Sequence, residues 1–180
     1  GTLAALGLSR PHMPYKGLIM AILISPMIVP LIITAAGMFF FYARINLVYT
    51  FTGVILAHVA LATPFVVITV TATLVGFDMN MVKAAQSLGA KPMRTFFKVI
   101  MPLILPGIIS GALFAFITSF DEVVIVMFMA SIDQLTIPKQ MWAGIRQEIS
   151  PVILCMATCL VLLSIFLFCL LYTSPSPRDS

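Results

Sequence analysis

Long intervals without a charged side chain dominate this sequence of 180 residues. Such intervals lie at 17–43, 45–77, 99–120 and 152–171. Each is long enough to cross a bilayer, because about 20 apolar residues in a helix span about 30 Å of hydrocarbon. Charged residues make up 9% of the chain, whereas a soluble domain usually carries about a quarter. These features predict an all-α integral membrane protein, a polytopic helical bundle.

The basic residues predict which loops face the cytoplasm, because short cytoplasmic loops carry the excess of Lys and Arg. More of them lie in the first loop, before residue 17, and in the third, between residues 78 and 98, than in the second and fourth loops. The first group is Arg10, Lys16, Lys83, Lys91, Arg94 and Lys98, and the second is Arg44, Lys139 and Arg146. We therefore expect the first and third loops to be cytoplasmic, where they can face anionic lipid or a protein partner.

The two ends of the chain carry expectations of their own. Residues 1–8 are apolar and resemble the last turns of a helix, so we expect a fragment with about four complete spans and one partial span. Residues 172–180 change abruptly to a polar composition. They are interpreted either as a polar cytoplasmic end or as non-native read-through sequence.

The third loop, from 76 to 106, contains signals for two short helices. Asp78 can cap a helix over 79–88, and Gly89 can end that helix in a left-handed turn. Pro92 suits the first turn of a second helix. In this second helix apolar residues recur at helical spacing opposite three basic ones. We expect an amphipathic helix off the membrane, a pattern that a simple interfacial helix with snorkelling lysines would share.

Two prolines follow this helix, and a proline disfavours continuation of a helix through its position. The sequence therefore predicts that Pro102 and Pro106 mark the turn into the next span.

The residues 83–90, together with 99–102, resemble the cytoplasmic "EAA" signature of binding-protein-dependent ABC importer permeases. That signature is Glu-Ala-Ala, three residues, Gly, nine residues, then Ile-x-Leu-Pro. Its small residues and proline are matched here by Ala84, Ala85, Gly89 and Pro102. Lys83 stands in place of the Glu, Val99 in place of the Ile and Met101 in place of the Leu.

The resemblance implies that the segment docks on a cytoplasmic ATPase subunit. The residues implied in this ATPase coupling are Lys83, Ala84, Ala85, Gly89, Ala90 and Pro102. The small side chains allow close approach to a partner, and Gly89 allows a bend because it has no Cβ. Lys83 cannot form a salt bridge that a Glu would make there.

The resemblance extends over roughly residues 10–168 and is strongest to the permeases of spermidine/putrescine importers. The segments that carry it are 56–58, 64–67, 74–78, 119–124, 137–142 and 149–151. It implies the type I ABC permease fold, with a partial permease domain over 1–171, in a bacterial inner membrane. It also implies three kinds of partner: a dimer of ATP-binding subunits that holds ATP-Mg, a second permease and an external binding protein. Polyamine is then the expected cargo, and this chain needs no cofactor of its own.

Asp121 and Glu122 lie next to each other at the outer end of the third interval. Carboxylates near a membrane are costly and usually face a bundle interior or water. We interpret them either as a boundary pair with a structural partner or as part of a path that attracts a polyamine cation. His58 lies within the second interval, where a histidine satisfied at a helix interface is favoured over a proton relay.

Other function classes find less support in the sequence. No phosphate-binding loop of the GxxxxGK type and no nucleophile with its own base is found, so no catalytic residue is assigned. No metal site is assigned either, and no basic run interleaved with aromatics indicates nucleic-acid binding. The alternatives left open are another small cargo, such as an amino-acid derivative or iron, a proton-coupled secondary transporter, and a scaffold without transport.

Overall fold

The computed structural model describes residues 1–10, 13–147 and 151–173, and every regular element in these ranges is a helix. The helices are, in chain order, α1 (Thr2–Leu8), α2 (Lys16–Ile28), α3 (Leu31–Arg44), α4 (Phe51–Val75), α5 (Met79–Ser87), α6 (Pro92–Thr95), a π-helix (Phe96–Ile100), α7 (Met101–Phe120), α8 (Val124–Met129), α9 (Ile137–Gln147) and α10 (Pro151–Thr173). The predicted all-α fold is confirmed. The tail predicted at 172–180 lies outside the described residues from 174 onward.

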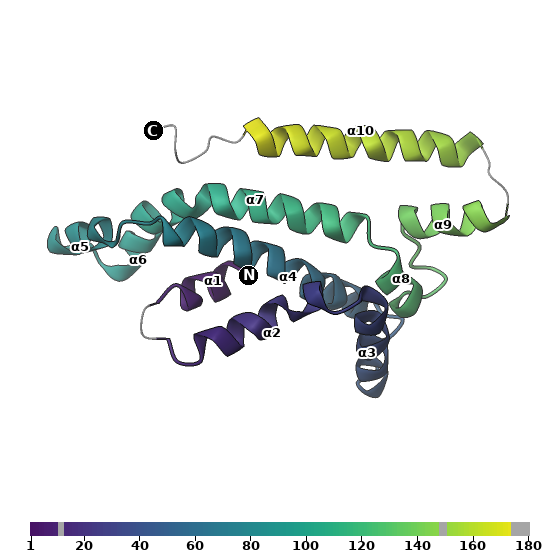
Figure 1. Ribbon diagram of the computed structural model, residues 1–180, viewed down its shortest axis with the longest axis horizontal. Helices are drawn as coiled ribbons and strands as arrows, with labels where there is room; N and C mark the ends of the chain where they lie inside the picture. Colours follow the sequence, from purple (N-terminus) through teal and green to yellow (C-terminus); the bar gives the residue numbers. More distant parts are fainter. Residues whose placement is uncertain (11–12, 148–150, 174–180) are drawn as a thin grey trace.

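Two long helices, α4 and α7, pack side by side along the middle of the molecule (Figure 1). Glycines of α7 make this contact close. A Cβ on Gly107 would collide with Thr73 Oγ1, and one on Gly111 would lie 3.0 Å from Val66 Cα of α4. Residues without a side chain at these positions let the two backbones approach. Two small residues four positions apart in α7 thus lie at its contact with α4.

Three helical stretches among the described residues are long and apolar enough to cross a membrane: Phe51–Val75, Pro92–Phe120 and Pro151–Cys169. They confirm the second, third and fourth predicted spans. The first predicted span, 17–43, is instead divided into α2 and α3. The chain bends by 108° between these two helices. The break lies at Val29 and Pro30, because the residue before a proline is extended and Pro30 cannot donate a backbone hydrogen bond.

The turn predicted at Pro102 and Pro106 is wrong. The helix from Pro92 to Phe120 is continuous, and both prolines lie inside it. A π-helix precedes Pro102 directly, and its wider turn leaves room for a proline ring that a regular α-helical turn lacks. The amphipathic segment after Lys91 is therefore the first part of the helix that forms a span rather than a separate helix.

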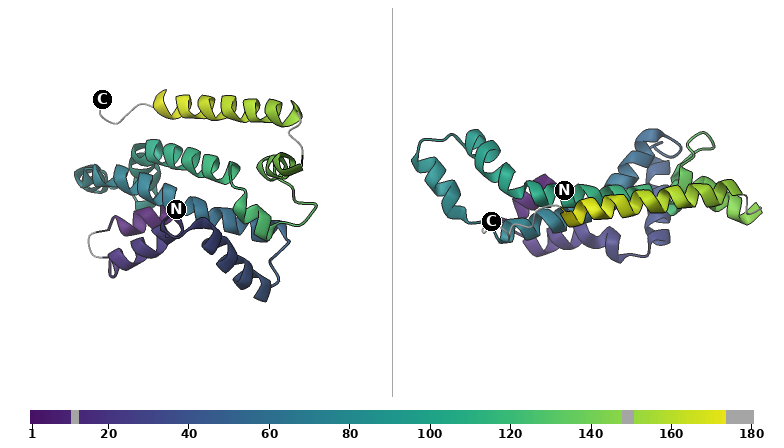
Figure 2. Two further views of the ribbon diagram at one scale, coloured as in Figure 1. Left: turned by 45° about the vertical axis from the view of Figure 1, so that its right-hand side comes forward. Right: turned by 90° about the horizontal axis from the view of Figure 1, so that it is seen from above.

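Buried apolar side chains gather in two clusters on either side of α4. One joins α3, α4 and α8 through Ala35, Ala57, Leu61, Ile125 and Met129, and the other joins α1, α4 and α7 through Ala5, Val70 and Ile104. By contrast, α10 runs beside α7 (Figure 2), and most of the apolar side chains described for it are exposed. An outward apolar surface suits a helix surrounded by lipid.

Candidate coupling surface and membrane cavity

The segment after α4 folds as a helical corner around Gly89. Asp78 caps α5, because its Oδ1 accepts a hydrogen bond of 2.9 Å from the backbone N–H of Asn80. At the other end Gly89 has a φ of 79°, a left-handed conformation that favours glycine. The backbone N–H of Ala90 donates to the carbonyl of Ala85 at 3.1 Å and closes the turn. The predicted helix, its cap and its glycine turn are confirmed.

The two faces of α5 differ in their surroundings. Val82 is buried and Ala85 is half-buried, on the face that packs against α6 and the π-helix. On an adjoining side Met81, Ala84 and Leu88, the last being the residue directly after α5, are exposed, Leu88 with 88% of its surface accessible. These three residues follow the spacing i, i+3, i+7 that places side chains on one side of a helix. We call Met81, Ala84 and Leu88 the outer face of α5.

Most residues implied in ATPase coupling lie at this corner. Lys83, Ala84 and Gly89 are exposed there, and Ala85 and Ala90 are half-buried. Pro102 lies elsewhere, within α7 and beyond the π-helix. The structure thus brings five of the six residues together. The exposed Met81 and Leu88 were not among them, although their helical spacing from Ala84 is visible in the sequence.

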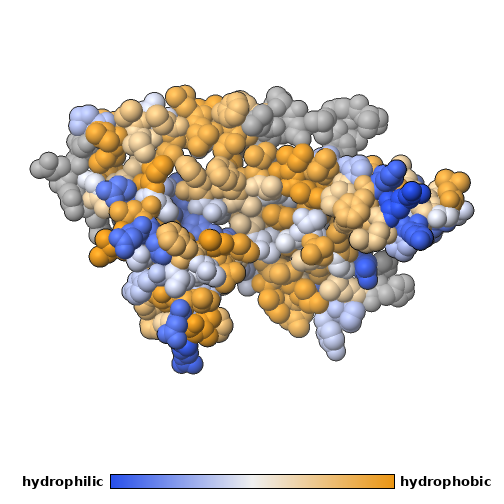
Figure 3. Space-filling model, turned by 180° about the vertical axis from the view of Figure 1, so that it is seen from behind, coloured by the Kyte–Doolittle hydropathy of each residue, from blue (hydrophilic) through white to orange (hydrophobic). Residues whose placement is uncertain are grey.

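Basic side chains surround the corner, a distribution that the charge rule expects of a cytoplasmic loop. Lys83, Lys91, Arg94 and Lys98 are all exposed. In Figure 3 hydrophilic residues gather at the right-hand end of the molecule, where α5 and α6 lie, whereas apolar residues cover most of the middle. The outer face of α5 therefore stands at a positively charged end, next to a mostly apolar body.

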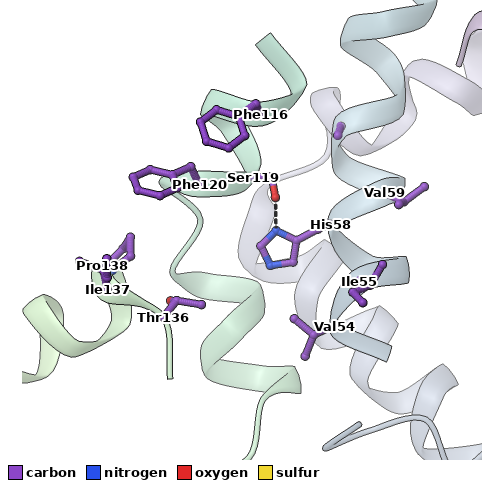
Figure 4. A pocket seen from close by; sticks show the side chains of 11 residues that line it. Val54, Ile55, His58, Val59, Phe116, Ser119, Phe120, Thr136, Ile137 and Pro138 are labelled. Atoms are coloured by element: carbon purple, nitrogen blue, oxygen red, sulfur yellow. Dashed lines mark hydrogen bonds between the residues drawn. The ribbon is translucent and has the colours of Figure 1, made fainter. Parts of the chain in front are cut away.

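A cavity of about 480 Å³ lies near the opposite end of α4, between α4, the end of α7 and the start of α9. Its wall is mostly apolar, and His58 contributes a polar ring. Figure 4 shows the His58 ring directed toward Ser119 of α7, with Nδ1 2.8 Å from Ser119 Oγ. The hydrogen bond agrees with the interpretation of His58 as a histidine satisfied at a helix interface. Sequence alone did not indicate Ser119, 61 residues away, as its partner.

The two neighbouring carboxylates after α7 have different surroundings. Asp121 is exposed and lines a second cavity, of about 280 Å³, between α7 and α10. Glu122 is buried, with 7% of its surface accessible, and its Oε1 accepts a hydrogen bond of 2.9 Å from the backbone N–H of Ile125. Glu122 thus holds the start of α8. Of the two cavities described here, Asp121 lines the second and Glu122 lines neither. Within the described ranges no group of three or more metal-ligating side chains is found.

The model of the family described as "binding-protein-dependent transport system inner membrane component" matches residues 1–176. The chain belongs to this family. It is therefore a multi-pass protein of the bacterial inner membrane, as its long apolar helices require. The family resemblance inferred from residues 83–102 is confirmed by a match over nearly the whole chain.

Relatives of this inner membrane component include polyamine permeases. The spermidine/putrescine transport system permease protein PotC of Haemophilus influenzae is 31% identical over 167 residues, which cover 93% of this chain and 65% of the relative. PotC of Escherichia coli is 30% identical over 165 residues, covering 92% of this chain and 62% of the relative. The putrescine transport system permease protein PotI of Escherichia coli is 37% identical over 103 residues, which cover 57% of this chain and 37% of the relative. The chain spans less than two thirds of the length of both PotC proteins.

Proposed function

We propose that this chain belongs to the permease subunit of an ATP-driven polyamine importer and that α5 couples it to a cytoplasmic ATPase. The observation that carries the proposal is the exposed outer face of α5, held at the basic end of the molecule by the Asp78 cap and the Gly89 turn. Three exposed apolar or small side chains in water are unfavourable on their own. A groove on a partner that covers Met81, Ala84 and Leu88 removes that exposure.

Contacts between helices connect α5 directly to the membrane-spanning helices. Its buried face packs on α6 and the π-helix, and these continue without a break into α7. In turn, α7 is packed tightly on α4 through Gly107 and Gly111. A displacement of α5 by the ATPase is therefore transmitted to a pair of rigid helices. ATP then shifts the equilibrium between outward- and inward-facing states by binding to the ATPase more strongly in one of them.

Each of the other proposed partners has its place relative to the membrane. ATP-Mg binds to the ATPase dimer, and a second permease completes the path through the membrane. An external binding protein delivers the cargo at the end of the molecule opposite α5, where α9 follows the cavity at His58. There Lys139 of α9 donates a hydrogen bond of 3.4 Å to the carbonyl of Val126 and so joins α9 to the buried α8.

Polyamine is favoured as cargo because two carboxylates lie at this same end and because PotC and PotI are named as polyamine permeases. Asp121 is accessible to a cation from the cavity between α7 and α10. Glu122 contributes a negative charge in a buried position, where the effective dielectric is lower and attraction to a cation is stronger.

A transport assay tests the proposed function. The full-length permease is reconstituted in proteoliposomes with its partner ATPase, second permease and binding protein, and uptake of radiolabelled putrescine and spermidine is measured. Uptake should require internal ATP and should continue when a protonophore removes the proton gradient. Uptake without ATP that stops with the protonophore would instead show a proton-coupled transporter. ATP-dependent uptake of an amino-acid derivative or iron, with none of polyamine, would retain the machinery and replace the cargo.

A further inference from the structure

The cavity at His58 combines an apolar wall with one polar corner. Val54, Ile55, Val59 and Ala62 of α4 form one side, and Phe116 and Phe120 of α7 form another. Figure 4 shows the two phenyl rings near Ser119 and Thr136 across the cavity from them. A linear chain of methylene groups fits such a wall, because it loses contact with water and has no polar atoms to satisfy.

One atom in the polar corner is left for a ligand. The His58 ring uses Nδ1 for Ser119, and Nε2 has no hydrogen-bond partner among the described residues. If Nδ1–H donates to Ser119 Oγ, Nε2 carries a lone pair and can accept from an ammonium group. Ser119 therefore orients the ring, and its hydroxyl, which can accept as well as donate, is compatible with the tautomer that would receive a cation.

The aromatic pair supplies a second attraction for a cation. Phe116 and Phe120 are stacked, with ring centroids 5.5 Å apart and an angle of 23° between their planes. Their faces are negative because of the ring quadrupole, and a cation within about 6 Å of a ring centroid is attracted to it.

Charge complementarity comes from Glu122. This carboxylate is more than nine-tenths buried and forms no ion pair within the described residues, since its recorded partner is the Ile125 backbone N–H. It does not line the cavity itself, but it follows Ser119, the hydrogen-bond partner of His58, by three residues. A buried charge of this kind is stabilised by an opposite charge nearby. A cation in the cavity would provide that charge.

We propose that the cavity between α4, α7 and α9 is a cargo subsite that holds a methylene segment of a linear polyamine, with one ammonium group at His58 Nε2. The subsite deepens the proposed function and rests on it. It lies near the start of α4, at the end away from α5, so cargo from outside would meet it before the tightly packed part of the α4–α7 pair. His58, Phe116 and Phe120 then determine which amines are accepted.

Occupancy can be measured without transport. In the full complex, with Cys155, Cys159 and Cys169 replaced by alanine, Ala62→Cys places one thiol on the cavity wall. We expect a water-soluble thiol reagent to modify it and spermidine to slow this modification severalfold. Ile132→Cys is the matched control: residue 132 is exposed between α8 and α9, outside the membrane-spanning helices, and lines neither cavity described above. Its modification should be the same with and without spermidine.

The role of His58 is tested by a substitution that retains one of its nitrogens. His58→Asn keeps an amide group at the position of Nδ1, next to Ser119, and removes Nε2. We expect the spermidine concentration that half-protects Ala62→Cys to rise about tenfold, the change expected on loss of one hydrogen bond to a charged group. An unchanged half-protecting concentration would overturn the assignment of Nε2.

Two results would overturn the subsite while leaving the proposed function intact. The first is the absence of spermidine protection at Ala62→Cys in a complex whose ATP-dependent polyamine uptake has been demonstrated. The second is a thiol that reacts only with a lipid-soluble maleimide, which would show that the cavity opens to lipid. A complex that transports no polyamine at all, assayed with all four subunits, would count against the proposed function itself.

Discussion

Thr73 of α4 and Gly107 of α7 are in direct contact, and a Cβ at residue 107 would overlap Thr73 Oγ1. The contact joins two spans at a point without space for a side chain. Close packing of this kind makes α4 and α7 move together, because interiors at high packing density deform little. A force applied to α7 at the end that continues into α6 is thus carried to α4, where His58 and its cavity lie.

Gly107→Leu should therefore destabilise the permease by about 1–3 kcal/mol, the usual cost of overpacking a filled interior. Thermal denaturation of the purified complex in detergent measures the effect as a lower midpoint. Gly37→Leu is the control, because nothing lies within 4 Å of a Cβ at this exposed position of α3. Equal midpoints for the two variants would contradict the close packing of α4 and α7.

Asp78→Ala should loosen α5 without affecting the spans. Loss of an N-cap acceptor costs a helix about 1 kcal/mol, and here the lost hydrogen bond is the one between Asp78 and the backbone of Asn80. Amide hydrogen exchange over 79–87 should become about fivefold faster, whereas α4 exchanges as before. Asp78→Asn retains an acceptor and should preserve slow exchange; equally fast exchange in both variants would assign the effect to charge.

Gly89 can be tested by residues that differ only in their tolerance of positive φ. A residue with a Cβ loses roughly 1–2 kcal/mol in the left-handed region, and asparagine loses least. Gly89→Val should reduce ATP-dependent uptake several-fold, Gly89→Asn should reduce it less, and Gly76→Val should serve as a control because Gly76 has a negative φ. The same uptake in all three variants would show that the turn is unimportant for coupling.

Glu122 contributes both a hydrogen bond and a charge, and these can be separated. Glu122→Gln keeps an acceptor for the backbone N–H of Ile125 and removes the negative charge. If the charge attracts the cationic cargo, putrescine uptake should fall about tenfold, the effect of losing one charge-assisted contact, while the thermal midpoint stays close to that of the parent. A fall in the midpoint that matches Glu122→Ala would show a purely structural role.

The sequence predicts the local features of this fold better than its tertiary ones. The length of the intervals without charged residues is enough to locate the three continuous spans. Asp78 and Gly89 mark the two ends of α5, because capping and positive φ depend on a few adjacent residues. The prolines give mixed results. Pro30 breaks a predicted span, whereas Pro102 and Pro106 lie inside a helix, since a preceding π-helix accommodates the first of them.

The candidate site shows the same division. The corner at Gly89 follows from a spacing along one segment, and it could be found from the sequence. The hydrogen bond between His58 and Ser119 joins two spans, and nothing in either segment specifies the partner. Glu122 and Asp121 are adjacent in sequence but have different surroundings, because the chain changes direction after α7 and α8 is buried against α3 and α4.

The central claim is that the outer face of α5 binds the ATPase, and Leu88→Asp tests it most directly. Co-purification of the ATPase subunit with the tagged full-length permease is measured for this variant and for Gln86→Asp, which adds the same charge to α5 away from that face. The predicted result is that Leu88→Asp loses at least about nine tenths of the bound ATPase, the effect of roughly 1.4 kcal/mol or more, while Gln86→Asp retains it. Retention of the ATPase by Leu88→Asp at the parent level would contradict the account.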